Sequence, residues 1–127
     1  MSLEENKISY IARGCIFEVY NQLGPGLLES VYESALSYEL LNQGLKIETQ
    51  VPIPVNYKDI PLEIGFRADI IIENKVIIEI KSIENIAEVH HKQVLTYMKL
   101  TGIKLGLLVN FNTEDIGKSI YRKVNKL

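Results

Sequence analysis

Three ionisable residues in the middle of the chain have the types and spacing to do chemistry together. Asp69 lies within the run ADIII, and Glu79 and Lys81 lie within the run VIIEIK. The apolar neighbours predict two strands that are largely buried on both faces. Side chains alternate along a strand, so Glu79 and Lys81 point to one face. If the loop between the strands is odd in length and centred at Asn74, Asp69 lies directly opposite Glu79.

Opposed carboxylates on a buried face repel each other unless a proton or a cation lies between them. Here the two Cβ atoms would be about 4.5–5.5 Å apart. A hard divalent ion, bound by carboxylate oxygens and water, satisfies such a pair. Lys81 could then hold an attacking water or stabilise charge on a phosphate oxygen. The group therefore suits metal-assisted hydrolysis of a phosphodiester.

Two alternatives to this interpretation remain open. A loop of even length would place Asp69 opposite Ile80 and would break the cluster. Asp69, Glu79 and Lys81 could also form a cross-strand ion-pair cluster with a structural role only.

Further acidic and polar side chains are expected on two helices. In a helix predicted over 28–42, Glu29 shares a face with Tyr32, Glu33 and Leu36. Glu29 could reach a metal through water, or it could simply favour the helix dipole in the first turn.

A helix predicted over 87–100 places His90, Gln93 and Tyr97 on one face. This polar row could contact a phosphate or Lys81. Alternatively, it is a solvated face with a half-buried tyrosine.

The elements that must position these residues follow from apolar periodicity and from Gly and Pro breaks. The strand predicted over 46–55 contains two prolines, so it is expected at the edge of the sheet or to be irregular. The order α-α-β-β-β-α-β predicts an α/β or α+β fold around a mixed sheet. The ranges are helices 6–23, 28–42 and 87–100, strands 46–55, 61–73, 75–83 and 104–110, and a tail from 115 that fits strand or helix.

Composition limits the class of protein. The chain has 127 residues, of which 46% are hydrophobic and 24% charged, which predicts one globular domain over 1–127. No apolar run approaches the ~20 residues of a membrane span, and the first residues do not resemble a signal peptide, so we expect a cytoplasmic protein. A lone cysteine, Cys15, excludes an internal disulfide. The net charge of −2 argues against a simple basic nucleic-acid binder.

Four segments together resemble a known protein group. They are GLLESVY (26–32), FRAD (66–69), EIK (79–81) and LLVNF (107–111). This pattern resembles the bacterial GxxExxY proteins of the PD-(D/E)XK nuclease superfamily, over nearly the whole chain. The proline that precedes the aspartate in the superfamily pattern is Ala68 here.

The resemblance implies a restriction-endonuclease-like α-β-β-β-α-β core with a mixed central sheet flanked by helices. It also implies a Mg²⁺-dependent phosphodiesterase site, with Mn²⁺ as an alternative ion. The residues it assigns are the metal ligands Asp69, Glu79 and the Ile80 carbonyl, the water-orienting Lys81, the helix-borne acid Glu29, which would reach the metal through water, and the supporting residues Tyr32, Gln93 and Tyr97.

The expected function is therefore that of a metal-dependent nuclease, with DNA rather than RNA as the preferred substrate. The alternative is a catalytically weak or inactive module of the same fold that binds nucleic acid or a protein partner. Small size and low positive charge motivate this alternative. A homodimer would suit so small a nuclease, and we expect no membrane association.

Overall fold

The computed structural model of the protein describes residues 4–127, without the side chains of residues 63 and 64. The predicted elements are present, and their ends lie within a few residues of the predicted ones. The tail, which the sequence left ambiguous, forms a short 3-10 helix and a strand. In chain order the elements are α1 (Glu5–Leu23), α2 (Glu29–Asn42), β1 (Ile47–Tyr57), β2 (Ile60–Ile72), β3 (Val76–Lys81), α3 (Glu88–Thr101), β4 (Leu105–Asn110), η1 (Ile116–Lys118) and β5 (Ile120–Val124).

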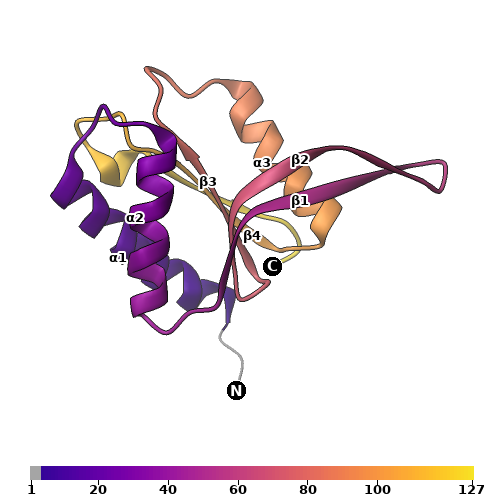
Figure 1. The fold of residues 1–127 in the computed structure, drawn as a ribbon, viewed down its shortest axis with the longest axis horizontal. Helices are drawn as coiled ribbons and strands as arrows, with labels where there is room; N and C mark the ends of the chain where they lie inside the picture. Colours follow the sequence, from indigo (N-terminus) through magenta and orange to yellow (C-terminus); the bar gives the residue numbers. More distant parts are fainter. Residues whose placement is uncertain (1–3) are drawn as a thin grey trace.

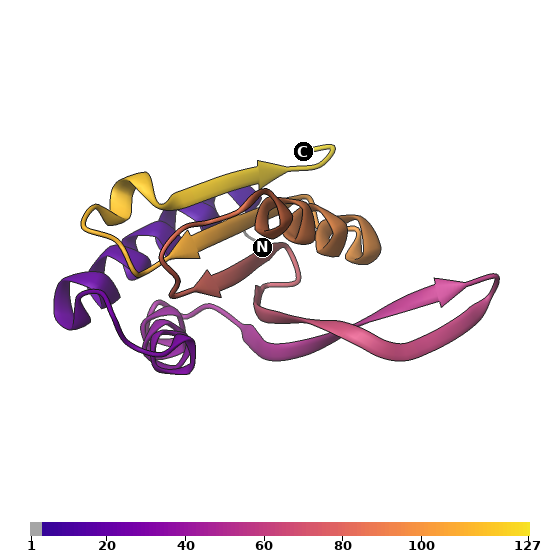
Figure 2. The same cartoon turned by 90° about the horizontal axis from the view of Figure 1, so that it is seen from above.

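Within the described residues, the strands form one mixed sheet in the order β1-β2-β3-β4-β5. Only β3 and β4 run parallel, and the other neighbours are antiparallel. Helices α1 and α2 cover one face, and α3 covers the other (Figure 1, Figure 2). The mixed sheet flanked by helices is thus confirmed, and it is consistent with a restriction-endonuclease-like fold. No helix in residues 4–127 combines the length and apolar character that crossing a bilayer requires.

Alternation along β3 divides its side chains between two cores. Ile78 and Ile80 belong to the core under α1 and α2. Ile77 belongs to the core under α3, so Glu79 and Lys81, which share its parity, project from the α3 face. The candidate residues of β3 therefore lie on the face that a single helix covers.

Helix α3 lies close against β4 because of one glycine. A Cβ atom at Gly106 would lie only 2.9 Å from Met98 Sδ and 2.9 Å from Val94 Cγ1. Since real Cβ contacts are longer than this, a larger residue would push α3 away from the sheet. Gly106 thus sets the height of α3 above the face that carries Glu79.

The β2–β3 hairpin has the odd loop on which the predicted site depends. Ile72 pairs with Val76, and Ile70 pairs with Ile78, which leaves residues 73–75 as the loop. Its central residue, Asn74, has a φ of 55°. In this register, Asp69 and Glu79 are the next opposed pair. The predicted opposition is confirmed, and the even-loop alternative is wrong.

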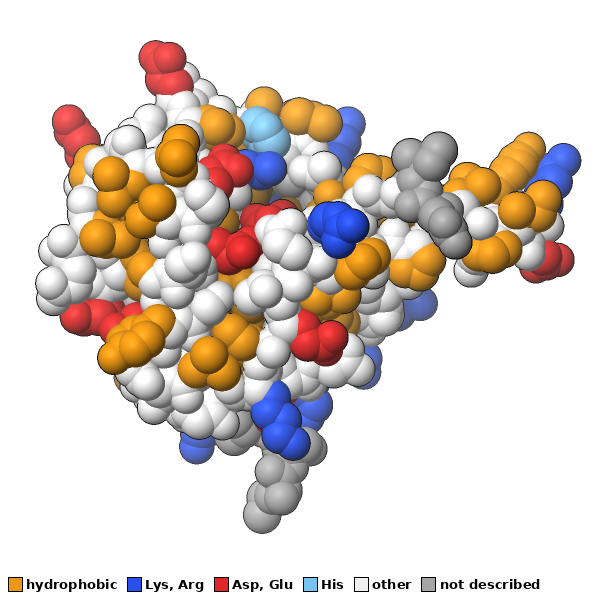
Figure 3. All heavy atoms as spheres, viewed as in Figure 1, with side chains coloured by type: hydrophobic (Ala, Val, Ile, Leu, Met, Phe, Trp, Pro, Cys, Tyr) orange, Lys and Arg blue, Asp and Glu red, His pale blue; other side chains and the backbone are white. Residues whose placement is uncertain are grey.

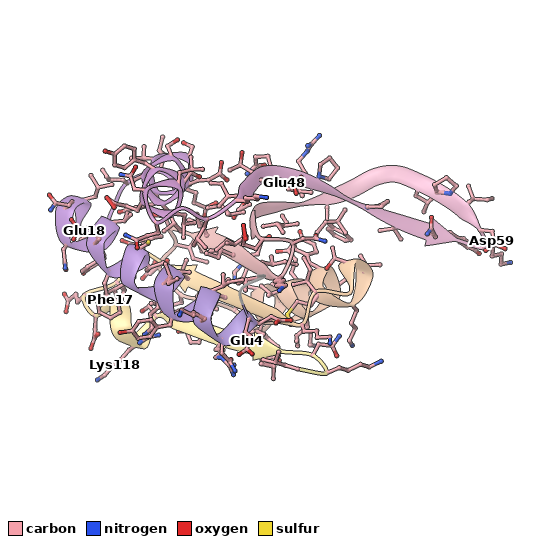
Figure 4. All side chains as sticks on the ribbon, turned by 90° about the horizontal axis from the view of Figure 1, so that it is seen from below. Glu4, Phe17, Glu18, Glu48, Asp59 and Lys118 are labelled. Carbon is pink, nitrogen blue, oxygen red and sulfur yellow. The ribbon has the colours of Figure 1, made fainter. Side chains whose placement is uncertain are left out.

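The β1–β2 hairpin projects beyond the rest of the molecule (Figure 1, Figure 2). We call its outer part, residues 54–65, the arm; Asp59 marks its tip in Figure 4. Strand β1 lies at the sheet edge, as its prolines predicted. The arm presents hydrophobic side chains to solvent (Figure 3), among them Tyr57, Ile60 and Leu62.

Candidate active site

The carboxylates of Asp69 and Glu79 occupy a gap between β2 and β3. The strand pairing ends at Ile70 and Ile78, and beyond this point side chains take over the backbone hydrogen bonds. Asp69 N donates to Glu79 Oε1 over 3.2 Å, and Ile80 N donates to Asp69 Oδ2 over 2.8 Å. Glu79 is only 4% exposed. The two acids are therefore held in a fixed, reciprocal arrangement.

Burial, then the charge of Asp69 and a hydrogen bond between the two carboxyl groups, together raise the pKa of Glu79 to about 9. The nearby charge of Lys81 opposes the shift without cancelling it. At neutral pH without a cation, Glu79 therefore keeps a proton. This is the state expected of two carboxyl groups forced together away from water.

The site includes Tyr97 from α3. Its pKa is raised to about 12, first by burial and then by the charges of Glu79 and Asp69. The hydroxyl group is therefore protonated at neutral pH and lies within the field of both acids. Its ring also contacts Phe66, with the ring centroids 5.2 Å apart.

Lys81 is half-buried on the strand that carries Glu79, and it forms no ion pair within residues 4–127. The salt bridge found there joins Lys118 to Asp115, over 3.9 Å. The described residues therefore do not form the cross-strand ion-pair cluster that was the structural alternative. The ammonium group of Lys81 is available to a ligand.

Glu29 connects the start of α2 to the end of β3. Its Oε2 atom accepts a hydrogen bond from Ser82 N over 2.9 Å. Ser82 Oγ in turn donates to Leu27 O over 2.6 Å. A favourable interaction with the helix dipole alone does not account for this contact, which places Glu29 beside the residue that follows Lys81.

Tyr32 organises the loop that precedes α2. Its fully buried ring stacks on Phe111, with centroids 4.3 Å apart and planes within 4°. Its hydroxyl donates to Gly24 O over 2.6 Å and accepts from Leu27 N over 3.1 Å. Phe111 N donates to Lys81 O over 2.9 Å. Tyr32 therefore joins the loop before Glu29 to the end of the strand that carries Lys81.

Sequence reasoning missed two residues in this arrangement, Ser82 and Asn110. The Asn110 side chain accepts from Ile83 N over 3.1 Å and donates to Ile83 O over 2.9 Å. Asn110 lies in the LLVNF segment, but no spacing rule connects it to residue 83. We call the set that holds the end of β3 the frame, comprising Leu27, Glu29, Tyr32, Ser82, Asn110 and Phe111.

Sequence reasoning also missed Gln50 and did not single out Glu33. Gln50 Nε2 donates to Glu33 Oε1 over 2.6 Å and to Asp69 Oδ1 over 3.2 Å. Burial raises the pKa of Glu33, the hydrogen bond from Gln50 lowers it, and the charge of Asp69 raises it. The shared helix face with Glu29 was a signal for Glu33, whereas Gln50 had none.

Two other polar residues of α3, His90 and Gln93, belong to the predicted row. His90 Nδ1 accepts from Ala87 N over 2.9 Å and so closes the first turn of the helix. Gln93 is half-buried, with no hydrogen bond to the carboxylates among the described residues. The charges of the two acids act on Tyr97, whereas neither Gln93 nor His90 hydrogen-bonds to them within the described residues. Gln93 lines a shallow hollow together with Phe66, Val89, Lys92 and Thr96.

The donor set limits which metal ion could bind. Within the described residues, no group of three or more His, Cys, Asp or Glu side chains is placed to hold a metal. Asp69 and Glu79 offer two carboxylates, and the adjacent Ile80 offers a backbone carbonyl. Two carboxylates with a carbonyl suit a small hard cation that keeps several water ligands. The residues therefore fit an ion of the Mg²⁺ type.

Comparison with known proteins gives one match. The family model of the PD-(D/E)XK nuclease superfamily matches residues 6–123. Nucleases of this superfamily generally use divalent metal ions. No curated protein and no solved structure matches the chain significantly.

Proposed function

Because the chain belongs to the PD-(D/E)XK nuclease superfamily, we propose that it is a divalent-metal-dependent nuclease. It would hydrolyse phosphodiester bonds of nucleic acid, with DNA rather than RNA as the preferred substrate. The observation that carries this proposal is the reciprocally bonded pair of Asp69, which is half-buried, and Glu79, which is buried. Within the superfamily, we assign the chain to the GxxExxY group. The joint contacts of Glu29 and Tyr32 at the start of α2 support this assignment.

The proposed cofactor is Mg²⁺, with Mn²⁺ as an alternative. Asp69, Glu79 and the Ile80 carbonyl would hold it, and Glu29 would reach it through water. Such an ion would stabilise charge on the phosphate and lower the pKa of a bound water. A cation would also offset the burial and the repulsion from Asp69 that together raise the pKa of Glu79.

The protein's own residues would bind and orient the phosphate. Lys81 would donate to a phosphate oxygen or hold the attacking water. Tyr97, protonated at neutral pH, would donate a hydrogen bond into the same space. Glu29 already bonds to Ser82 N, so it also holds the end of β3 in place.

A binding module without turnover is the competing function. The observation that favours it is the small donor set, because, of the residues that the structure describes, only two acidic side chains meet in the gap between β2 and β3. Such a module would bind nucleic acid or a protein through the same face without using Lys81 chemically.

The decisive experiment measures cleavage of labelled DNA and RNA, single- and double-stranded, with Mg²⁺, Mn²⁺ or EDTA. We expect metal-dependent cleavage that is lost in Lys81→Ala. Lys118→Ala is the matched control, because Lys118 is exposed and pairs only with Asp115. Cleavage by both variants would exclude the proposed role of Lys81. Binding without cleavage, together with calorimetric metal binding, would favour the module.

We further propose that the protein forms a homodimer through the arm. Tyr57, Ile60 and Leu62 are exposed there, and the arm has one lysine against two acidic residues, Asp59 and Glu63, so an apolar partner fits better than a phosphate backbone. A second copy would also extend the surface available to grip a duplex. We expect Ile60→Ser to give monomers by analytical ultracentrifugation, and Tyr10→Ser on α1 to leave the dimer intact. We also propose a cytoplasmic location for the protein.

A further inference from the structure

Gln50 has an unusual backbone conformation for a strand residue. Its φ is 50°, in the left-handed region, although it lies inside β1. The flanking pairs, Thr49 with Ile70 and Val51 with Ala68, keep one register across this position. The conformation is therefore not the result of an inserted bulge residue. A left-handed residue other than glycine costs about 1 kcal/mol or more and persists where other contacts hold it.

The side chain of Gln50 shows what this conformation achieves. One nitrogen, Nε2, donates to Asp69 Oδ1 over 3.2 Å and to Glu33 Oε1 over 2.6 Å. The main chain of Gln50 is also held, because Arg67 Nη1 donates to its carbonyl over 3.2 Å. The conformation thus coincides with a link from α2, through β1, to the acid on β2.

Gln50 completes the fixation of the Asp69 carboxylate. Ile80 N holds Oδ2 over 2.8 Å, while Gln50 holds Oδ1. With both oxygens bonded, the plane of the carboxylate is set on two sides. Without Gln50, the carboxylate would be held from the β3 side alone, by Ile80 N and the Glu79 carboxyl group, and its soft terminal torsion would be less restricted.

We propose that Gln50 is a positioning residue that orients the Asp69 carboxylate and couples it to Glu33, at the cost of a strained backbone. This inference rests on the proposed function for its catalytic consequence. An amide suits the task because its two N–H groups serve two carboxylates without neutralising either one. A lysine there would compensate the negative charge that attracts a cation, and a glutamate would add to the repulsion.

The first test separates the side chain from the backbone strain. Gln50→Gly removes the amide, and glycine adopts the left-handed region readily. We therefore expect an unchanged or higher melting temperature. In the same variant, hydrogen exchange at the Ile80 amide should become several-fold faster, because its acceptor is less ordered. Asn74→Gly, at a φ of 55° in the β2–β3 loop, is the control and should leave Ile80 exchange unchanged.

The second test measures the effect of Gln50 on the rate of cleavage. Gln50→Gly should lower kcat roughly 10- to 100-fold with little change in KM, as expected for a misplaced catalytic group. Gln50→Asn tolerates the same backbone but is too short to bridge both acids, so it should recover little of the rate. Asn74→Gly should cleave like the native protein.

The outcomes distinguish this inference from the proposed function. Unchanged Ile80 exchange in Gln50→Gly, or a lower melting temperature with a matching loss of rate, would overturn the positioning role. If the native protein cleaves no substrate but Ile80 exchange still accelerates in Gln50→Gly, the positioning role stands and the nuclease proposal fails.

Discussion

The frame and the carboxylate pair lie side by side but are built in opposite ways. In the frame, polar groups meet partners of opposite character, as in the hydrogen bonds of Tyr32 and Asn110. At the pair, Asp69 and Glu79 bring two acids together in a buried gap, and the pKa of Glu79 rises to about 9. The frame stabilises the fold, whereas the pair is destabilising until a cation or proton arrives.

The contrast explains why the frame lies where it does. It holds the residues directly after β3 through Ser82 N and through both backbone groups of Ile83. When Glu79 loses its proton, repulsion would drive its carboxylate away from Asp69, and a fixed end of β3 opposes this movement. Functional sites commonly hold such unfavourable arrangements, supported by their surroundings.

The largest expected effect comes from removing one acid of the pair, so that the two carboxylates no longer repel each other. Glu79→Gln replaces a buried acid by a neutral group of the same size. We expect metal-dependent cleavage to fall at least about 100-fold. Stability at pH 8 in EDTA should rise by a few kcal/mol, because the unfolded state no longer gains from ionising this residue. Cleavage assays and urea unfolding check both effects; a less stable variant with normal cleavage would contradict the comparison.

Damage to the frame should reduce stability first. Tyr32→Ala removes a fully buried ring and should cost about 3–5 kcal/mol in urea unfolding. Tyr32→Phe keeps the stack on Phe111 but leaves Gly24 O and Leu27 N without their partner, so we expect a cost of about 1–3 kcal/mol. Tyr38→Phe, at an exposed position on α2, should stay within about 0.5 kcal/mol of the native protein. Equal stability of all three variants would show that Tyr32 does not stabilise the frame.

The pH dependence of stability should identify the pair directly. In the folded protein Glu79 keeps its proton up to about pH 9, whereas a free glutamate loses it near 4.5. Between these values the folded state binds more protons, so stability falls as pH rises, by up to about 1.4 kcal/mol per pH unit from this group. Thermal melts in EDTA from pH 5 to 9 should show this slope reduced in Glu79→Gln. Parallel profiles for the two proteins would show that Glu79 does not cause the pH dependence.

The smallest expected effects contrast two glycines that both have room for a side chain. A Cβ at Gly26 or Gly14 meets no atom within 4 Å. Gly26 has a φ of 95°, so Gly26→Ala should cost roughly 1–2 kcal/mol through backbone strain alone. Gly14 lies inside α1, so Gly14→Ala should add about 0.5–1 kcal/mol of stability. Chemical unfolding of both variants would show whether the loop before α2 requires its left-handed glycine.

Much of the fold could be predicted because its determinants are local. Apolar periodicity indicated the helices, and the prolines of β1 indicated an edge strand. The loop centred at Asn74 set the register that opposes Asp69 to Glu79, since pairing propagates residue by residue from a short turn. The tail stayed ambiguous because β5 is short and depends on β4 for its pairing.

The site was less predictable wherever it depends on contacts between distant segments. Tyr97 could be placed on a helix face, but which helix residue meets the acids depends on how α3 sits against Gly106. Gln93, on the same helix, lines a hollow with Phe66 and makes no hydrogen bond to the acids within the described residues. The role of Gln50 could not be predicted from the sequence, because it depends on an unusual φ and on a bond to Glu33, which is distant in the sequence.

By itself, the sequence determined the order of elements, the opposition of the two acids and the position of Lys81 on the same strand face as Glu79. These depend on alternation and on one short loop, which act within a few residues. Only the tertiary structure decided that Glu29 holds Ser82, that Tyr32 stacks on a residue of the β4 end, and that Gln50 bridges two acids. Such contacts join segments many residues apart, and only packing against the completed sheet brings them within hydrogen-bonding distance.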